Sequence, residues 1–508
     1  MSAVTATPHA LRLIVRHEWR LLTRSRTFWV CALSIAGLVG FATRNGAVWA
    51  DHQRATIRSI QQHDDDGYRR IKADLAELAR QGDPHPVLNA AGMVWYILQA
   101  DGAAPPAPHL DPRRAEAAAS EWVGARYAVL PAAPLAALAI GQSDLHPYYS
   151  RVTIRTRPIL INSDELENPA NLVNGRLDLA FVLTFCWPLL VMPLTYDMLA
   201  DERDNGTLTL LASQPVRLRT LLAGKVLVRG GAMVVLTAAA SVVTLIGLAS
   251  VWPGSATTAG LAAWVALIVA NGLLWFGVAA WVNSAGWRSG LNAIVLTVAW
   301  LGWVVVVPSA VGLMARAVAP VPSRVQLINE VRAAGNLDSQ ELRSLLTTYQ
   351  EANPDSLPIA DSADSVAIRG LALQDEVDRR IDPVLSRYRD SLARQQRLVD
   401  YLRFASPAIL MYDATTELAG TSTTRYRRFA EQLDDFQHAW RAYFYPLVHR
   451  RVTLAAAHYD GAPRFIFREA PSAVLAMRVW LPIAAIGSVG LLMLFLSVRA
   501  LSRYPVLR

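Results

Sequence analysis

Few residues in this sequence have the types and spacing that support chemistry. His63 precedes three aspartates, Asp64, Asp65 and Asp66, and such a run of oxygen ligands suits a divalent cation. Consecutive side chains of a helix point in different directions, however, so these carboxylates do not converge on one ion. A solvated acidic turn is the favoured interpretation, and a cation site is the alternative.

Two further histidines, His438 and His449, flank an aromatic segment at residues 440–445. They lie about three helical turns apart and can share one face. We favour a packed aromatic face with peripheral histidines over a paired site. The sequence has neither an HExxH zinc motif nor a GxSxG nucleophile motif. A membrane-embedded enzyme is therefore the weakest hypothesis, and we expect no catalytic residue and no bound metal.

A nucleotide site would need a phosphate-binding loop of the form GxxxxGK[ST]. The nearest sequence is Ala223-Gly224-Lys225-Val226, which lacks both the upstream glycine and the hydroxyl residue after the lysine. We therefore expect no cofactor on this chain. If ATP drives it, ATP and Mg must bind to a separate ATPase.

The most distinctive stretch is residues 196–225, which separates two apolar runs. Its charged residues 201–204 lead into Asn205-Gly206, a turn signal. A mostly apolar helical segment follows at residues 208–211 and ends before Pro215, where a helix normally stops. Charged residues and a turn between two apolar runs indicate a loop at a membrane surface.

This stretch resembles the loop between the second and third membrane helices of ABC-2-type transporter permeases. In that family the loop forms a short coupling helix that docks on the ATPase subunit. The residues that match the pattern are Glu202, Gly206, Thr207, Pro215, Arg219, Gly224 and Lys225. The coupling candidates that the resemblance implies are Glu202, Arg203, Gly206, Thr207, Leu210, Pro215, Arg219 and Lys225. An ordinary cytoplasmic loop is the alternative.

Composition identifies a membrane protein. The chain has 508 residues, of which 53% are hydrophobic and only 18% charged, and its mean hydropathy is +0.25. That is too apolar for a soluble chain of this size. The net charge of +8 does not come from one basic tract, so we expect no nucleic-acid partner. Cys31 and Cys186 both lie in apolar runs, which excludes a disulfide framework in exported loops.

The N-terminal segment, residues 1–26, is amphipathic. Arg12, Arg16, Arg20 and Arg24 recur every four residues and form one stripe of a helix, with Leu and Trp residues on the neighbouring face. Such a helix lies in the membrane interface and contacts lipid. It resembles the elbow helix of ABC-2 permeases, and a plain basic flank is the alternative. Its positive charge places the N-terminus in the cytoplasm.

We expect six membrane spans, at residues 27–43, 177–199, 226–251, 261–282, 290–314 and 474–498. The basic tail at 499–508 then also lies in the cytoplasm. Pro188 and Pro193 should kink the second span. Asn271 should face other helices, as structural glue in preference to a substrate contact. The short loop that carries Asn283 and Arg288 is a second candidate contact for the ATPase.

Two long polar regions, 44–176 and 315–473, should lie outside the cytoplasm and be mostly helical. We expect helices at 55–81 and 113–130, a strand within 151–161, and a helix at 366–404 that Pro383 breaks or bends. The sequence leaves open whether the two regions form one domain.

The second polar region carries its own resemblance, over about 60 residues. It is similar to a family of ABC-2-related permeases with large exported insertions, the DUF3526 type, which is gliding-motility-permease-like. Ser422 departs from the acidic residue expected at its position. The matching residues are Ser406-Pro407-Ala408, Leu418-Ala419-Gly420-Thr421, Phe429, Trp440, Phe444, Pro446, Tyr459-Asp460, Pro463 and Phe465.

Together these features predict a mainly α, polytopic protein of the bacterial inner membrane, of the ABC-2 or type V exporter kind, with periplasmic insertions. The resemblance implies a permease subunit that works with a cytoplasmic ABC ATPase dimer and with a second permease chain, either a copy of itself or a sister. The first alternative is a mechanotransmitter that acts on a periplasmic protein partner. The second is a membrane receptor or sensor without an ATPase.

Overall fold

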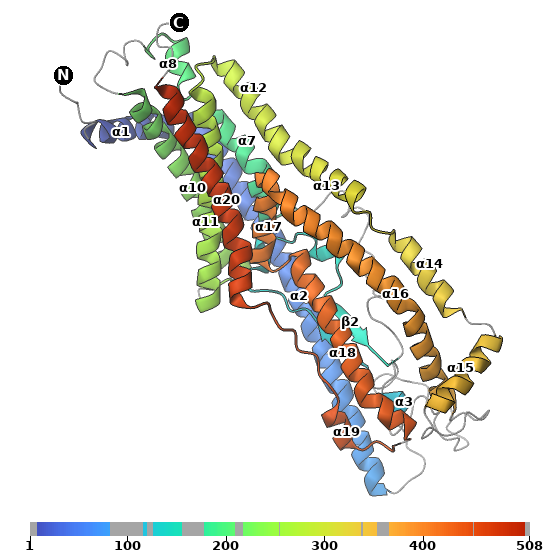
Figure 1. Cartoon of the computed structure of the whole chain (residues 1–508). Helices are drawn as coiled ribbons and strands as arrows, with labels where there is room; N and C mark the ends of the chain where they lie inside the picture. Colours follow the sequence, from blue (N-terminus) through green and yellow to red (C-terminus); the bar gives the residue numbers. More distant parts are fainter. Residues whose placement is uncertain are drawn as a thin grey trace.

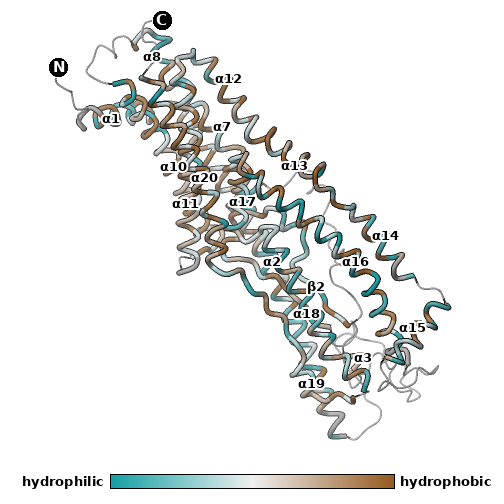
Figure 2. Tube along the Cα trace, in the orientation of Figure 1, coloured by the Kyte–Doolittle hydropathy of each residue, from teal (hydrophilic) through white to brown (hydrophobic). Residues whose placement is uncertain are grey.

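The computed structural model describes residues 8–81, 115–118, 125–154, 177–208, 217–252, 254–336, 339–352, 365–450 and 452–502. The molecule is elongated, with a bundle of apolar helices at one end and a more polar, mostly helical region at the other (Figures 1 and 2). This arrangement confirms the mainly α membrane protein that composition predicted. Five described helices are long and apolar enough to cross a membrane.

The bundle is built from five long elements and one broken one. In α11, 72% of the most apolar 18-residue stretch is buried inside the chain, whereas in the other four long spans the buried share is 17–39%. Helix α11 is therefore the central span. The long elements are α2 (Arg26–Gln81), α10 (Leu218–Ala249), α11 (Ser255–Asn283), the continuous run α12 (Ser289–Trp300), η7 (Leu301–Val306) and α13 (Val307–Val318), and α20 (Ser472–Leu501).

The second expected span is short and irregular, as its prolines suggest. It consists of α6 (Leu179–Phe181), the π-helical η5 (Val182–Cys186), α7 (Trp187–Val191) and the 3₁₀ turn η6 (Met192–Leu194). Pro188, the second residue after the π-helical turn, lacks the N–H that a regular helix would use there.

Asn271 of α11 compensates for this irregularity. Its Nδ2 donates to the carbonyl oxygen of Leu183, within the π-helical turn, at 3.2 Å. The side chain is 4% exposed, so an unpaired amide here would be costly. The contact agrees with a role as structural glue between helices.

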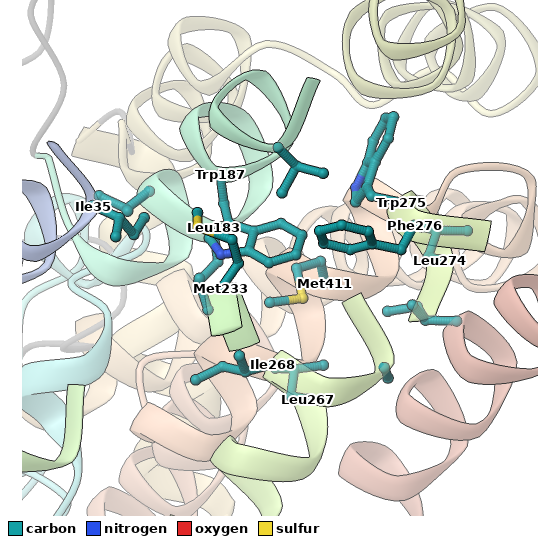
Figure 3. Close-up of a cluster of buried hydrophobic side chains, with 14 of the residues drawn as sticks. Ile35, Leu183, Trp187, Met233, Leu267, Ile268, Leu274, Trp275, Phe276 and Met411 are labelled. Carbon is teal, nitrogen blue, oxygen red and sulfur yellow. The ribbon is translucent and has the colours of Figure 1, made fainter. Parts of the chain in front are cut away.

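A large hydrophobic core surrounds this contact (Figure 3). Trp187 of α7 is fully buried and stands edge-on to Phe276 of α11, with ring centroids 6.4 Å apart. Its indole N–H donates to the hydroxyl of Thr237 in α10 at 2.9 Å. The broken span is therefore held by packing and by side-chain hydrogen bonds to its neighbours.

Helix α2 differs from the expected pattern. We predicted a span at 27–43 followed by a separate helix at 55–81, whereas the structure has one helix of 56 residues, Arg26–Gln81. At 1.5 Å per residue it is roughly 84 Å long, and it passes from the bundle into the polar region (Figure 1). No proline or charged turn interrupts residues 43–55, so the helix continues.

The first polar region also contains a small sheet. Strand β1 (Arg126–Val129) pairs antiparallel with β2 (Tyr149–Val152), with Arg126 opposite Val152. The predicted helix at 113–130 is therefore wrong over the β1 residues, although α3 (Ala115–Ala118) is helical. The predicted strand at 151–161 is present only in part, as the end of β2. Ala125, Leu130, Thr153 and Ile154 are described and belong to no helix or strand, whereas residues 113–114, 119–124 and 155–161 lie outside the described parts of the chain.

The two polar regions share one hydrophobic core. Trp49, Ile57 and Tyr68 of α2 belong to the same buried cluster as Phe429 and Trp440 of α18. This answers the question that the sequence left open, because neither region encloses this core alone. The remaining helices here are α14 (Arg324–Gly335), α15 (Ser339–Ala352), α16 (Ser365–Leu402), α17 (Pro407–Ala419), α18 (Thr423–His449) and α19 (Ala456–Gly461).

Helices α16 and α17 form a hairpin that returns toward the bundle. Pro383 lies inside α16, which continues through it. Of the two predicted outcomes, a break or a bend, the break therefore does not occur. At the hairpin apex, the hydroxyl of Ser406 caps α17 and donates to the carbonyl oxygen of Trp303 at 2.7 Å. Trp303 lies near the middle of the span Ser289–Val318. Part of the region expected outside the membrane thus lies level with the spans.

Candidate functional site

The sequence-predicted coupling residues gather at the end of the bundle opposite the polar region. Helix α1 (Pro8–Arg24) lies across the bundle there, and the short helix α8 (Ala200–Asp204) lies at the tip of the bundle (Figure 1). The first turns of α10 and α12 complete this end, which also holds both described chain termini (Figure 1). Residues 209–216, including the candidates Leu210 and Pro215, lie outside the described residues.

A buried charge cluster joins three of these elements. Lys225 of α10 is 3% exposed and forms an ion pair with Glu202 of α8. Its Nζ also lies 3.7 Å from Oε1 of Glu18 in α1. Glu18, likewise 3% exposed, has its Oε2 3.6 Å from Nη2 of Arg229. Lys225 and Glu202 are thus placed to hold this end together.

Arg229 extends the cluster to the broken span. Its Nη1 donates to the carbonyl oxygen of Leu194 at 2.8 Å and to Oδ1 of Asp197 at 3.2 Å. Leu194 ends η6, where the chain leaves regular helical geometry, and its carbonyl needs an external partner. The charges of α1, α8 and α10 therefore support the exit of the second span.

Close backbone approach adds to these ion pairs. A Cβ atom at Gly224 would lie 2.5 Å from Cγ2 of Ile14 in α1. Only glycine allows α1 and α10 to approach this closely. The glycine that the sequence resemblance singled out therefore acts in helix packing.

The turn after α8 uses the predicted Gly206 and Thr207. Gly206 has φ +73°, in the left-handed region that favours glycine. The hydroxyl of Thr207 donates to the carbonyl oxygen of Glu202 at 3.1 Å, so it closes α8. The described helix α8 thus precedes Gly206. Of the helix that we expected at 208–211, only Leu208 is described, and it is helical and buried.

The second loop joins the first through hydrogen bonds. Asn283 is 1% exposed; its Oδ1 accepts from the backbone N–H of Leu199 at 3.1 Å, and its Nδ2 donates to the carbonyl oxygen of Thr195 at 2.9 Å. Asn292 donates to the carbonyl oxygen of Tyr196 at 3.0 Å. The two loops that the sequence proposed separately therefore form one platform. It consists of residues 195–208 and 283–292 with the start of α10 at 217–225, whose Lys225 pairs with Glu202, and is called here the loop platform.

A carboxylate at the rim of the loop platform makes the last link. Oδ2 of Asp204 accepts from the hydroxyl of Ser289 at 2.8 Å and from its backbone N–H at 3.2 Å. These hydrogen bonds, with the nearby cations Arg288 and Arg203, lower the pKa of Asp204. The carboxylate therefore stays charged and keeps the start of α12 attached to α8.

Exposed cations of the platform can meet another protein. Arg219 and Arg288 are exposed, and Arg203 is half-buried. Sequence reasoning did not propose six members of the site, Glu18, Asp197, Asp204, Arg229, Ser289 and Asn292. A signal was present for Glu18, since it is the sole carboxylate in an otherwise basic helix.

The other chemical candidates have structural partners. Oδ2 of Asp64 lies 2.9 Å from Nη1 of Arg126, and burial raises the pKa of this aspartate. Nε2 of His449 lies 3.2 Å from the hydroxyl of Tyr349, whereas His438 is exposed. Within the described ranges, no group of three or more metal-binding side chains comes together.

Comparison with known families agrees with both resemblances. Residues 162–301 match the model of the ABC-2 family transporter protein, a range that contains the broken span, the loop platform, α10 and α11. Residues 324–468 match a domain of unknown function, DUF3526, a range that contains the α16–α17 hairpin. No curated protein matches the sequence. The chain is therefore similar to ABC-2 family transporter proteins over residues 162–301 and to DUF3526 domains over residues 324–468.

Proposed function

We propose that this membrane permease couples ATP hydrolysis by a separate ABC ATPase to the movement of a substrate across the bacterial inner membrane. The observation that carries the proposal is the loop platform, in which two short loops are bonded to each other and to α10, which in turn pairs with Glu18 of α1. ABC-2 permeases are generally non-catalytic membrane components. ATP and Mg would therefore bind to the ATPase and not to this chain.

The loop platform gives a route for force. A push on α8 would reach α10 through Glu202 and Lys225, and the broken span through Arg229 and Asp197. The same push would reach α11 and α12 through Asn283 and Asn292. Because these contacts are buried or short, the elements would move together. The second span and the α12–α13 span would relay the motion to the polar region, which we place in the periplasm.

The remaining partners follow from the same proposal. An ABC ATPase works as a dimer, so a second permease chain, a copy or a sister, would sit beside this one. We place α1, the loop platform and both termini in the cytoplasm, because the arginines flanking the spans lie at this end.

Purification from native membranes tests the docking proposal. We expect a tagged chain extracted in mild detergent to bring a stoichiometric soluble protein with a Walker motif, identified by mass spectrometry. Arg219→Glu combined with Arg288→Glu should remove that protein, because both side chains are exposed on the platform. The control is Arg316→Glu on α13, an exposed arginine at the other end of its span. Docking on the platform would be contradicted if the soluble protein still co-purified with the platform variant, or if it were lost from the control variant as well.

A second function is favoured by α2. This helix runs without a break from the span into the hydrophobic core of the polar region, so it can carry motion to a periplasmic protein partner. For this mechanotransmitter, ATPase activity in reconstituted vesicles should rise only when the protein partner is added. For a transporter it should rise with a small or lipidic substrate alone.

A further inference from the structure

We infer that α1 is a clamp controlled by anionic lipid. Phospholipid headgroups of the adjacent leaflet would bind its arginine face and thereby hold Glu18 against Lys225 and Arg229. The inference rests on the proposed function only in that the clamp supports the loop platform. It adds a ligand class, anionic phospholipid, and a regulatory role.

The arginine face of α1 is open and free of carboxylates. Arg12, Arg16, Arg20 and Arg24 are all exposed and form one stripe at four-residue spacing. Glu18, the sole acid of α1, points away from them and is buried. A surface of this charge fits the phosphate groups of an anionic bilayer.

A second face of α1 is apolar and equally open. Leu13 is 68% exposed, Trp19 is 51% exposed and Leu21 is 50% exposed. Next to them Trp29 of α2 is 52% exposed, and its indole N–H donates to the carbonyl oxygen of Thr23 at 2.8 Å. Large apolar side chains beside an arginine stripe are typical of a helix that lies in the membrane interface, with one face among acyl chains.

The third face makes a narrow contact with α10. Ile14 fits against Gly224, and Glu18 reaches Lys225 and Arg229. The two ion pairs of Glu18 are long, at 3.6 and 3.7 Å, and among the described residues its Oε2 has no hydrogen-bond partner. Only Ser25 separates α1 from α2. Leu22 and Val15 of α1 also pack in the hydrophobic core. The hold therefore combines apolar packing with the Coulombic attraction of Glu18, and a change in the charge of the surroundings can shift the docking equilibrium of α1.

An anionic surface favours the docked state for a physical reason. When α1 leaves α10, Glu18 becomes exposed beside the headgroups, and its negative charge is repelled by them. When α1 is docked, only the arginines face the surface. Because the lipid interacts differently with the two states, it shifts the population toward the docked one. Neutral lipid provides no such difference in charge interaction.

A distance measurement between α1 and α10 tests the clamp directly. Spin labels would be placed at His17→Cys and Leu227→Cys, both exposed positions, in a full-length chain carrying Cys31→Ala and Cys186→Ala. Double electron–electron resonance would measure the distance between the two labels in nanodiscs of phosphatidylcholine, with or without phosphatidylglycerol. We expect a narrow distribution of label-to-label distances with phosphatidylglycerol, because α1 stays docked, and a broad distribution without it. The docked-to-undocked ratio should change by about fivefold, because the two states differ by the one charge of Glu18 beside the headgroups.

Three variants separate the lipid effect from a purely structural one. Replacing all four arginines by glutamine should give a broad distribution in both lipids, although the Glu18 contacts are untouched. Glu18→Gln should also give a broad distance distribution in both lipid compositions. The control Arg316→Gln should respond as the parent does. Inorganic phosphate added to neutral nanodiscs should not narrow the distribution, because a free anion does not form a surface.

Equal distributions in the two lipids would overturn the inference, as would a narrow one in the four-arginine variant with phosphatidylglycerol. Narrowing by inorganic phosphate alone would show that a free anion, and not lipid, is the ligand. The readout uses no ATPase. Failure of an ATPase to co-purify would therefore contradict the proposed function and leave the clamp standing, and failure of the clamp would leave ATPase docking standing.

Discussion

At the scale of residues, the buried charges beneath the loop platform are costly unless each has a partner. Lys225 and Arg229 face three carboxylates, Glu18, Asp197 and Glu202. Breaking a buried ion pair from one side is strongly destabilising, since it leaves an uncompensated charge in a low-dielectric site. The cluster therefore makes the arrangement of α1, α8 and α10 sensitive to single substitutions.

Lys225→Met should destabilise the protein by about 3–5 kcal/mol, because Glu18 and Glu202 lose their shared cation. The measurement is thermal unfolding in a fixed detergent. Arg219→Met is the matched control, since Arg219 is exposed and should change stability little. Equal melting temperatures for the two variants would show that the cluster does not hold this end together.

At the scale of elements, one glycine sets the packing of α1 on α10. Gly224→Ala should destabilise by about 1–3 kcal/mol, since the new Cβ would overlap Cγ2 of Ile14. Adding Ile14→Ala should restore much of the loss. Gly231→Ala is the control, because a Cβ there meets nothing within 4 Å, and it should stabilise α10 slightly. The measurement is the free energy of unfolding of the wild type, the two single variants and the double variant. If adding Ile14→Ala does not restore stability, the contact between Gly224 and Ile14 is contradicted.

The link between α8 and α12 should depend on pH. The folded protein lowers the pKa of Asp204, so its contribution to stability is fully present above the unfolded value of about 3.9 and is lost as pH falls through the folded pKa. Wild type should therefore melt above Asp204→Ala at neutral pH, and the difference should vanish in acid. A difference in melting temperature that stays constant between neutral and acidic pH would exclude this role of the carboxylate.

The long apolar elements could be predicted from the sequence, whereas their junctions could not. Hydropathy places the spans because each needs about 20 apolar residues. The prolines of the second span predicted a kink, but not that Asn271 would bond the π-helical turn. Continuity of α2 was missed because polar composition after residue 43 resembled a loop. Strand β1 was missed because its four residues depend on pairing with β2, a partner distant in sequence.

The candidate site was predictable only where a local pattern existed. Gly206, Thr207 and Glu202 lie in one turn, so their spacing carries information. Glu18 and Lys225 are far apart in sequence, and nothing local indicates that they meet. Their partnership follows from the fold, which brings α1 onto α10. The same fold turns Lys225 from an expected docking residue into a buried one.

At the scale of the whole molecule, a single helix connects the membrane end to the shared core of the polar region. Motion at the loop platform can therefore reach both the spans and the far region without a flexible joint in α2. The α16–α17 hairpin adds a second connection, since Ser406 binds Trp303 in the middle of a span. The architecture suits a permease whose work at one face is passed to a large domain at the other.

Photo-crosslinking in native membranes tests this account most directly. A photoreactive phenylalanine would replace Arg219 or Arg288 on the loop platform, and Arg316 as the control. The account predicts that the two platform positions crosslink to one soluble protein with a Walker motif, and that the control position does not. Crosslinks only to lipid or envelope proteins at Arg219 and Arg288 would contradict it, because the platform would then not be the ATPase docking surface.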